Sequence, residues 1–202
     1  LGKKILIAGT LASVADGVFA LETVDIRLAW LGAVSYCLQL YFDFSGCIDM
    51  AIGLGKAFGF STRENFNAPY TAVSVGDFWR RWLMSLSAWF KDYVYIPLGG
   101  TRLGKLRAGI NKCIVFALCG IWHGANWKYV AFGIWNGGII MLSTLLEPIF
   151  EMWTQKLRIN AKSLGFRLFQ MLRTFVVVAI GYVFDVAANF KDAMYTFGKM
   201  IT

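Results

Sequence analysis

The only histidine in the 202 residues, His123, lies in a stretch with almost no other ionisable group. Between Cys113 and Leu146 the one other ionisable residue is Lys128. A desolvated imidazole stays neutral at pH 7 and can take a proton from a hydroxyl, which is the task of a general base. A structural histidine, bonded to a backbone carbonyl where two helices meet, fits the same isolation. If the surroundings are a membrane, function is the default interpretation.

Two further residues complete the predicted catalytic set. Asn126, about one helical turn after His123, carries an amide that can donate to a developing oxyanion. Asp43 can orient the imidazole or the substrate. A carboxylate that pairs with Arg80 or Arg81 at a membrane surface explains Asp43 equally well.

Arg80, Arg81 and Trp122 are the predicted substrate-binding residues. With the bases between 102 and 112, the arginines can hold the phosphates of a bound ligand, although a plain preference of basic loops for the cytoplasm explains them equally well. The cysteines have no Cys-x-x-Cys spacing, so we expect buried free thiols, no metal site and no bound cofactor. They are Cys37, Cys47, Cys113 and Cys119.

The composition places these residues in a membrane. The chain is 57% hydrophobic, and its long apolar runs alternate with short basic ones. The net charge of +8 would also suit nucleic acid, but bases beside apolar runs suit loops that face anionic lipid, so we expect membrane lipid and no nucleic acid as a partner. We predict an all-α, multi-span transmembrane bundle that forms one membrane domain over residues 1–202. Residue 1 is leucine and no signal peptide is visible, which favours a fragment of something larger.

The first half of the chain predicts a helix over 5–21 and its clearest span over 28–48. The apolar piece 50–60 is too short to cross a bilayer and predicts a re-entrant or interfacial helix. Ser74 and Asp77 have the spacing of a capping box, which predicts an amphipathic helix over 77–93. A loop over 101–112 follows.

The apolar stretch 113–146 would reach about 51 Å as one helix, so it must break, and 124–126 is the predicted place. Ten residues from Cys113 to Trp122 would put His123 near mid-bilayer depth. A hairpin with both ends cytoplasmic agrees with the dense bases at 80–112 and 156–173, whereas a short re-entrant leg followed by one span does not. The sequence leaves both open. A last span over 174–190 contains Asp185.

A set of short motifs, in consistent order from about residue 3 to 190, resembles the membrane-bound O-acyltransferase (MBOAT) family, in its alginate O-acetyltransferase branch. Each motif is weak alone, and together they are specific. They are YFDFSG at 41–46, ENFNAPY at 64–70, FWRRW at 78–82, YIPLGG at 95–100 and WHGANW at 122–127.

The resemblance implies that this chain is similar to the C-terminal half or so of a larger enzyme in a bacterial inner membrane. It implies transfer of an acetyl group from a cytoplasmic thioester, acetyl-CoA or another acyl thioester, toward hydroxyls of a cell-envelope or secreted polysaccharide. A periplasmic or extracellular acetyltransferase partner protein is implied as well.

The chain also departs from the family pattern. Relatives usually have histidine where Leu83 stands and again where Asn136 stands, and their VFFRA segment is Val-Phe-Asp-Val-Ala at 183–187. The loss at Leu83 puts a two-histidine mechanism in doubt. The alternative function is a non-catalytic or truncated membrane scaffold that binds partner proteins.

Overall fold

The computed structural model describes residues 1–201, and within them every regular element is a helix. The chain divides into two compact units, residues 1–67 with 179–202 and residues 68–178. The expected all-α class is confirmed. One membrane domain over 1–202 stays a prediction, and each unit is described by itself.

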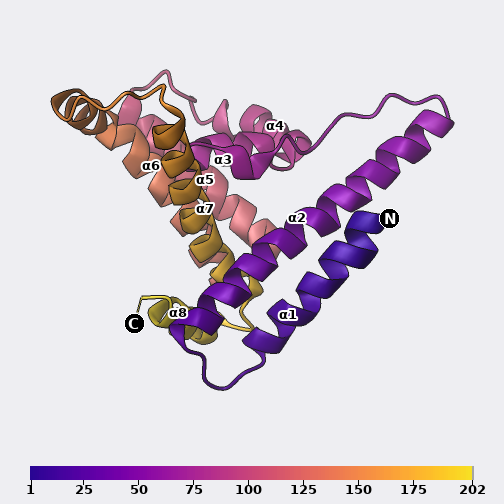
Figure 1. The fold of residues 1–202 in the computed structure, drawn as a ribbon. Coiled ribbons are helices and arrows are strands. Elements are labelled where there is room, and N and C mark those ends of the chain that lie inside the picture. The colour runs from indigo at the N-terminus through magenta and orange to yellow at the C-terminus, as the bar shows by residue number, and fades with distance from the viewer. Residues whose placement is uncertain (202) are drawn as a thin grey trace. The chain divides into compact units, whose positions relative to one another are not determined.

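Unit 1 is built around a long helix, α2 (Ile26–Ala57), which η1 (Lys3–Ala8) and α1 (Gly9–Phe19) accompany (Figure 1). The Asp25 side chain begins α2 by accepting a hydrogen bond from the Leu28 N–H at 2.8 Å. The separate short helix expected over 50–60 is wrong, because α2 continues through that region. Its glycines lie inside the helix, and the chain turns only at Gly59, with φ +80°.

The core of unit 1 joins α1 and α2 to the end of α7 (Leu164–Val186) and to α8 (Phe190–Lys199). Val18, Ala33, Val183 and Met200 are buried together there. Asp185, which the sequence placed in the last span, accepts a hydrogen bond from the Tyr36 hydroxyl at 2.7 Å. Asp185 therefore has a polar partner within unit 1. The helix that contains it, α7, begins at Leu164, ten residues before the predicted start of the last span.

Unit 2 contains a tight helical hairpin of α5 (Lys105–His123) and α6 (Trp127–Lys156). The predicted break at 124–126 is confirmed. The loop expected over 101–112 is too long, because α5 begins right after Gly104, whose φ is +89°. A Cβ on Gly120 would lie 2.2 Å from the Tyr129 carbonyl oxygen, and one on Gly133 would lie 2.3 Å from that of Phe116. The two backbones meet at these glycines, as in close-packed membrane helices.

The helix predicted over 77–93 is interrupted. Ser74 does cap α3 (Val75–Arg81), accepting from the Asp77 N–H at 3.1 Å. The helix then stops, because Trp82 is extended and Leu83 is left-handed, with φ +42°, before α4 (Met84–Phe90) begins. A wide-turned helix, η3 (Lys91–Tyr95), follows, and the short helix η2 (Pro69–Thr71) precedes α3. No glycine or proline marks the break.

Among the described residues, α6 and α7 are long and apolar enough to cross a membrane, judged by length and composition alone. α2, which holds the predicted span 28–48, is longer but is not one of the two. Polar side chains such as Gln39 and Asp43 lower its mean hydropathy. The multi-span arrangement beyond α6 and α7, with re-entrant and interfacial helices, stays a prediction.

Candidate active site

His123 is the last residue of α5, directly at the hairpin turn of unit 2. Its side chain is exposed, and so is that of Trp122, which keeps 62% of its surface exposed. The enclosure that we invoked for a neutral imidazole is therefore not supplied by the residues of this unit.

Two aromatic rings of α6 pack against the imidazole of His123. The ring centroids of His123 and Phe132 are 5.3 Å apart, and those of His123 and Tyr129 are 6.0 Å apart. The backbone contact of Gly120 with Tyr129 draws this part of α6 toward α5. Sequence reasoning missed both rings. Tyr129 and Phe132 come near His123 only because the turn at 124–126 folds α6 back against α5. The predicted turn was therefore the one sequence feature from which these contacts could have been inferred.

Asn126 is the residue that caps α6. Its side-chain oxygen accepts a hydrogen bond from the Lys128 N–H at 3.1 Å. The amide NH₂ group is the half that an oxyanion would use, so capping and donation are compatible. The structure thus brings His123, Asn126 and Trp122 to one turn, and the roles predicted for them in catalysis and substrate binding stay predictions.

A buried asparagine connects this hairpin to α3. The Trp79 indole N–H donates to the Asn136 side-chain oxygen at 3.0 Å, and the Asn136 NH₂ group donates to the Phe132 carbonyl at 2.9 Å. Asn136 is only 1% exposed. At this position, where the family resemblance implied a histidine, Asn136 forms a satisfied structural link to Trp79 and to the Phe132 carbonyl.

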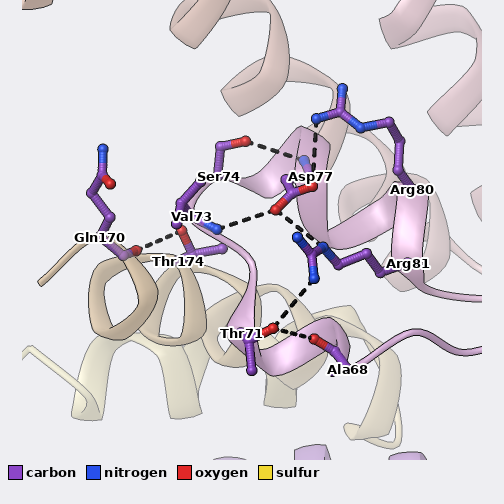
Figure 2. Close-up of polar contacts among 9 residues, drawn as sticks. All are labelled: Ala68, Thr71, Val73, Ser74, Asp77, Arg80, Arg81, Gln170 and Thr174. Carbon is purple, nitrogen blue, oxygen red and sulfur yellow. Dashed lines mark hydrogen bonds and ion pairs between the residues drawn. The ribbon is translucent and has the colours of Figure 1, made fainter. Parts of the chain in front are cut away.

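The predicted substrate-binding arginines are engaged with Asp77 on their own helix (Figure 2). The Asp77 carboxylate lies 3.1 Å from Arg81 Nε and 3.5 Å from Arg80. Burial alone would raise the pKa of Asp77, but the hydrogen bond and charge of Arg81 outweigh burial, so this pKa is lowered. The Arg80 side chain remains 74% exposed and the Arg81 side chain 29%, so Arg80 is the more accessible cation.

Further contacts fix the chain that leads into α3. Arg81 donates to the Thr71 hydroxyl at 3.3 Å, and Asp77 accepts from the Val73 N–H at 3.4 Å (Figure 2). Arg173 of α7 donates to the Val73 carbonyl at 2.9 Å. The spacing of Asp77, Arg80 and Arg81 indicated their pairing, whereas the contact of Arg81 with Thr71 was not visible in the sequence. The predicted role of Arg81 in substrate binding stays a prediction.

Asp43 lies in unit 1, on α2. Its carboxylate pairs with the Lys4 ammonium group, and the Lys4 side chain also reaches the Cys47 sulfur at 3.5 Å. Within unit 1 the partner of Asp43 is Lys4, and within unit 2 both arginines pair with Asp77. The alternative pairing of Asp43 with Arg80 or Arg81 stays a prediction. The role of Asp43 toward His123 stays a prediction.

Comparison with known proteins supplies the family. A family model described as MBOAT, membrane-bound O-acyltransferase family, matches residues 19–184. The chain is 44% identical to a probable alginate O-acetylase AlgI of Pseudomonas syringae pv. tomato, over 97% of this chain and 37% of the relative.

Relatives with other substrates in their names are also similar to the chain. A peptidoglycan O-acetyltransferase of Helicobacter pylori is 39% identical over 98% of this chain and 36% of the relative. A teichoic acid D-alanyltransferase of Bacillus subtilis is 32% identical over 74% of this chain and 39% of the relative. The chain spans little more than a third of the length of the curated relatives it matches.

Proposed function

This chain belongs to the membrane-bound O-acyltransferase family, and we propose that it carries the reaction centre of a cell-envelope O-acetyltransferase. The observation that carries the proposal is the hairpin turn, where the only histidine of the chain stands three residues before the amide of Asn126. Acyl transfer to a hydroxyl needs a proton acceptor and an oxyanion donor, and this turn contains both chemical types.

The reaction follows from these roles. The His123 imidazole takes the proton of an acceptor hydroxyl, and the hydroxyl oxygen attacks the carbonyl carbon of the thioester. The NH₂ group of Asn126 donates to the oxyanion that forms. The carbon–sulfur bond then breaks, the leaving thiolate recovers the proton from the imidazolium, and the products are an ester and a free thiol. Only one histidine is needed in this scheme, which agrees with leucine at position 83.

The donor in this proposal is acetyl-CoA or another acyl thioester on the cytoplasmic side, and exposed Arg80 is the cation available to its phosphates. The acceptor is a polysaccharide of the cell envelope or a secreted one, because relatives are named for alginate, peptidoglycan and teichoic acid. A periplasmic or extracellular acetyltransferase partner receives or relays the group in a multi-pass protein of the inner membrane.

The experiment uses membranes that carry the full-length protein and its partner proteins, supplied with labelled acetyl-CoA. We expect the wild type to label extracellular polymer and His123→Ala to lose about 10²–10⁴-fold in rate at equal membrane levels. Equal activity of the two proteins would remove His123 from the reaction. An inactive wild type would favour the scaffold function instead.

Asn126 allows a sharper second comparison. Asn126→Asp keeps an oxygen that caps α6 but has no NH₂ group, whereas Asn126→Ala removes both. We expect the aspartate variant to fold like the wild type and lose about 10²–10³-fold in rate. The alanine variant should lose about 1 kcal/mol of stability as well. Full activity of Asn126→Asp would assign Asn126 to capping alone.

A further inference from the structure

Most of the net positive charge of this chain gathers at the end of the α5/α6 hairpin opposite His123. The ranges 102–112 and 147–167 contain eight Lys or Arg residues and two Glu, a net +6 of the total +8. We name these eight residues the basic end, and seven of them are exposed, with Lys112 half-buried. They are Arg102, Lys105, Arg107, Lys112, Lys156, Arg158, Lys162 and Arg167.

The contacts between the two helices show that both charged ranges belong to the same end of the hairpin. Lys112 donates to the Thr144 hydroxyl at 3.3 Å, and Lys105 lies 3.4 Å from the Glu147 carboxylate. Lys105 is the first residue of α5, so α6 continues beyond its partner from residue 148 to 156, about 14 Å of helix. We call these nine residues the α6 extension.

The α6 extension combines exposed apolar side chains with bases. Ile149, Phe150, Met152 and Trp153 are 46%, 54%, 54% and 48% exposed. The Lys156 ammonium group lies 5.3 Å from the Trp153 ring centroid. Exposed tryptophan and phenylalanine beside lysine and arginine are typical of a helix at the membrane interface.

We propose that the basic end and the α6 extension together bind the anionic phospholipid surface of one membrane leaflet. A leaflet supplies acyl chains for the apolar side chains and phosphates for the bases at the same place. A protein segment that covered the extension would have to bring apolar groups and about six acidic ones. The proposal is independent of His123 and of acyl transfer.

The test measures which lipid stays with the purified full-length protein. The protein, in detergent, is equilibrated with equal amounts of phosphatidylglycerol and phosphatidylcholine, and the retained lipid is counted by mass spectrometry. The variant changes Lys156, Arg158, Lys162 and Arg167 to Gln. The matched control removes four exposed bases of unit 1 in the same way: Arg27, Lys56, Arg63 and Lys191.

We expect wild type and control to retain phosphatidylglycerol preferentially. Each base near a lipid surface adds roughly a fivefold preference, so the variant should lose at least about tenfold of the enrichment. Equal enrichment in variant and control would overturn the proposal, and so would equal retention of the two lipids by the wild type.

Two further arms keep the test decisive if the variant does not fold. Wild-type enrichment should fall when salt rises from 0.1 M to 1 M, because the screening length shrinks from about 10 Å to 3 Å. Enrichment that ignores salt contradicts a charged lipid surface. Millimolar inorganic pyrophosphate should leave the lipid in place. Its displacement would reassign the basic end to a soluble polyphosphate and overturn the lipid assignment.

Discussion

At the scale of single residues, Leu83 occupies a backbone conformation that suits other side chains better. Its φ of +42° and ψ of +61° are left-handed, which costs most residues about 1–2 kcal/mol. Histidine, asparagine and aspartate adopt this conformation more readily. The histidine that the family resemblance implied at this position would therefore suit the break between α3 and α4 better than the leucine does.

We predict that Leu83→His is accommodated with an unchanged or slightly higher unfolding free energy, by up to about 1 kcal/mol. Leu83→Val should lower it by about 1 kcal/mol or more, because a β-branched side chain is an outlier at positive φ. Thermal unfolding of the full-length protein in detergent measures both. A valine variant as stable as the wild type would mean that the break relaxes.

Asp77 makes the stability of the α3 region depend on pH. Its pKa in the folded protein is lowered from 3.8, so the ionised carboxylate interacts more favourably with its neighbours, Arg81 above all, than the protonated carboxyl does. The contribution of Asp77 to the free energy of unfolding is fully present above the ordinary carboxyl pKa. It is lost as the pH falls below about 4 and through the lowered pKa of the folded protein. Protection of α3 amides from hydrogen exchange, measured at pH 6 and pH 3, should show this loss.

Asp77→Asn should remove that pH-dependent part and lower stability near pH 7 by about 1–2 kcal/mol. Asp92→Asn is the matched control, because Asp92 is an exposed carboxylate of the same unit. Identical pH profiles for wild type and Asp77→Asn would show that the Arg81 pair is not formed in solution.

The site residues show what single-residue reasoning could and could not find. His123 and Asn126 were visible because they share one short motif at a predicted turn. The pairing of Asp43 with Lys4 could not be predicted, because the two residues are far apart in sequence and meet only when η1 packs beside α2. Tyr129 and Phe132 were missed for the same reason.

At the scale of elements, the α5/α6 hairpin depends on glycines at which the two backbones touch. A methyl group on Gly133 would lie 2.3 Å from the Phe116 carbonyl oxygen, a backbone atom that cannot move alone. We predict that Gly133→Ala separates the helices and lowers stability by about 1–3 kcal/mol or more. Acetyl transfer should fall with it, because Tyr129 and Phe132 would move from His123.

Gly138→Ala is the control, since a Cβ there meets nothing within 4 Å. The same substitution, five residues along the same helix, should be neutral or slightly stabilising. The melting temperatures of the Gly133→Ala and Gly138→Ala variants in detergent test whether the close approach at Gly133 stabilises the hairpin. Equal values would mean that the hairpin is packed more loosely than these distances require.

Helix boundaries could be predicted where the sequence carries a capping residue or a glycine at the boundary. The Ser74 cap and the turn at 124–126 carry capping and glycine signals, and both are confirmed. The break at Leu83 carries none. The glycines near the end of α2 suggested an interruption, but the helix continues through them to Ala57, and α5 begins directly after Gly104, earlier than the bases indicated.

At the scale of the whole molecule, the uneven charge predicts which end of α7 faces which side. Lys and Arg are dense before α7 and sparse after it, which favours a cytoplasmic start and an external end. A cysteine at Asn160 should react with a membrane-impermeant thiol reagent only in inverted vesicles, and one at Ala188 only in intact cells. The opposite pattern would reverse the proposed direction of transfer.

The three-residue connection between α5 and α6 bears on how the chain enters the bilayer. With so short a link, we expect α5 and α6 to enter the bilayer together as one hairpin. In that case the eight bases of the basic end would remain on the side of entry, and only His123 and Lys128 would move with the turn. If so, we expect the imidazole to enter the bilayer already packed against Phe132, whose ring centroid lies 5.3 Å away.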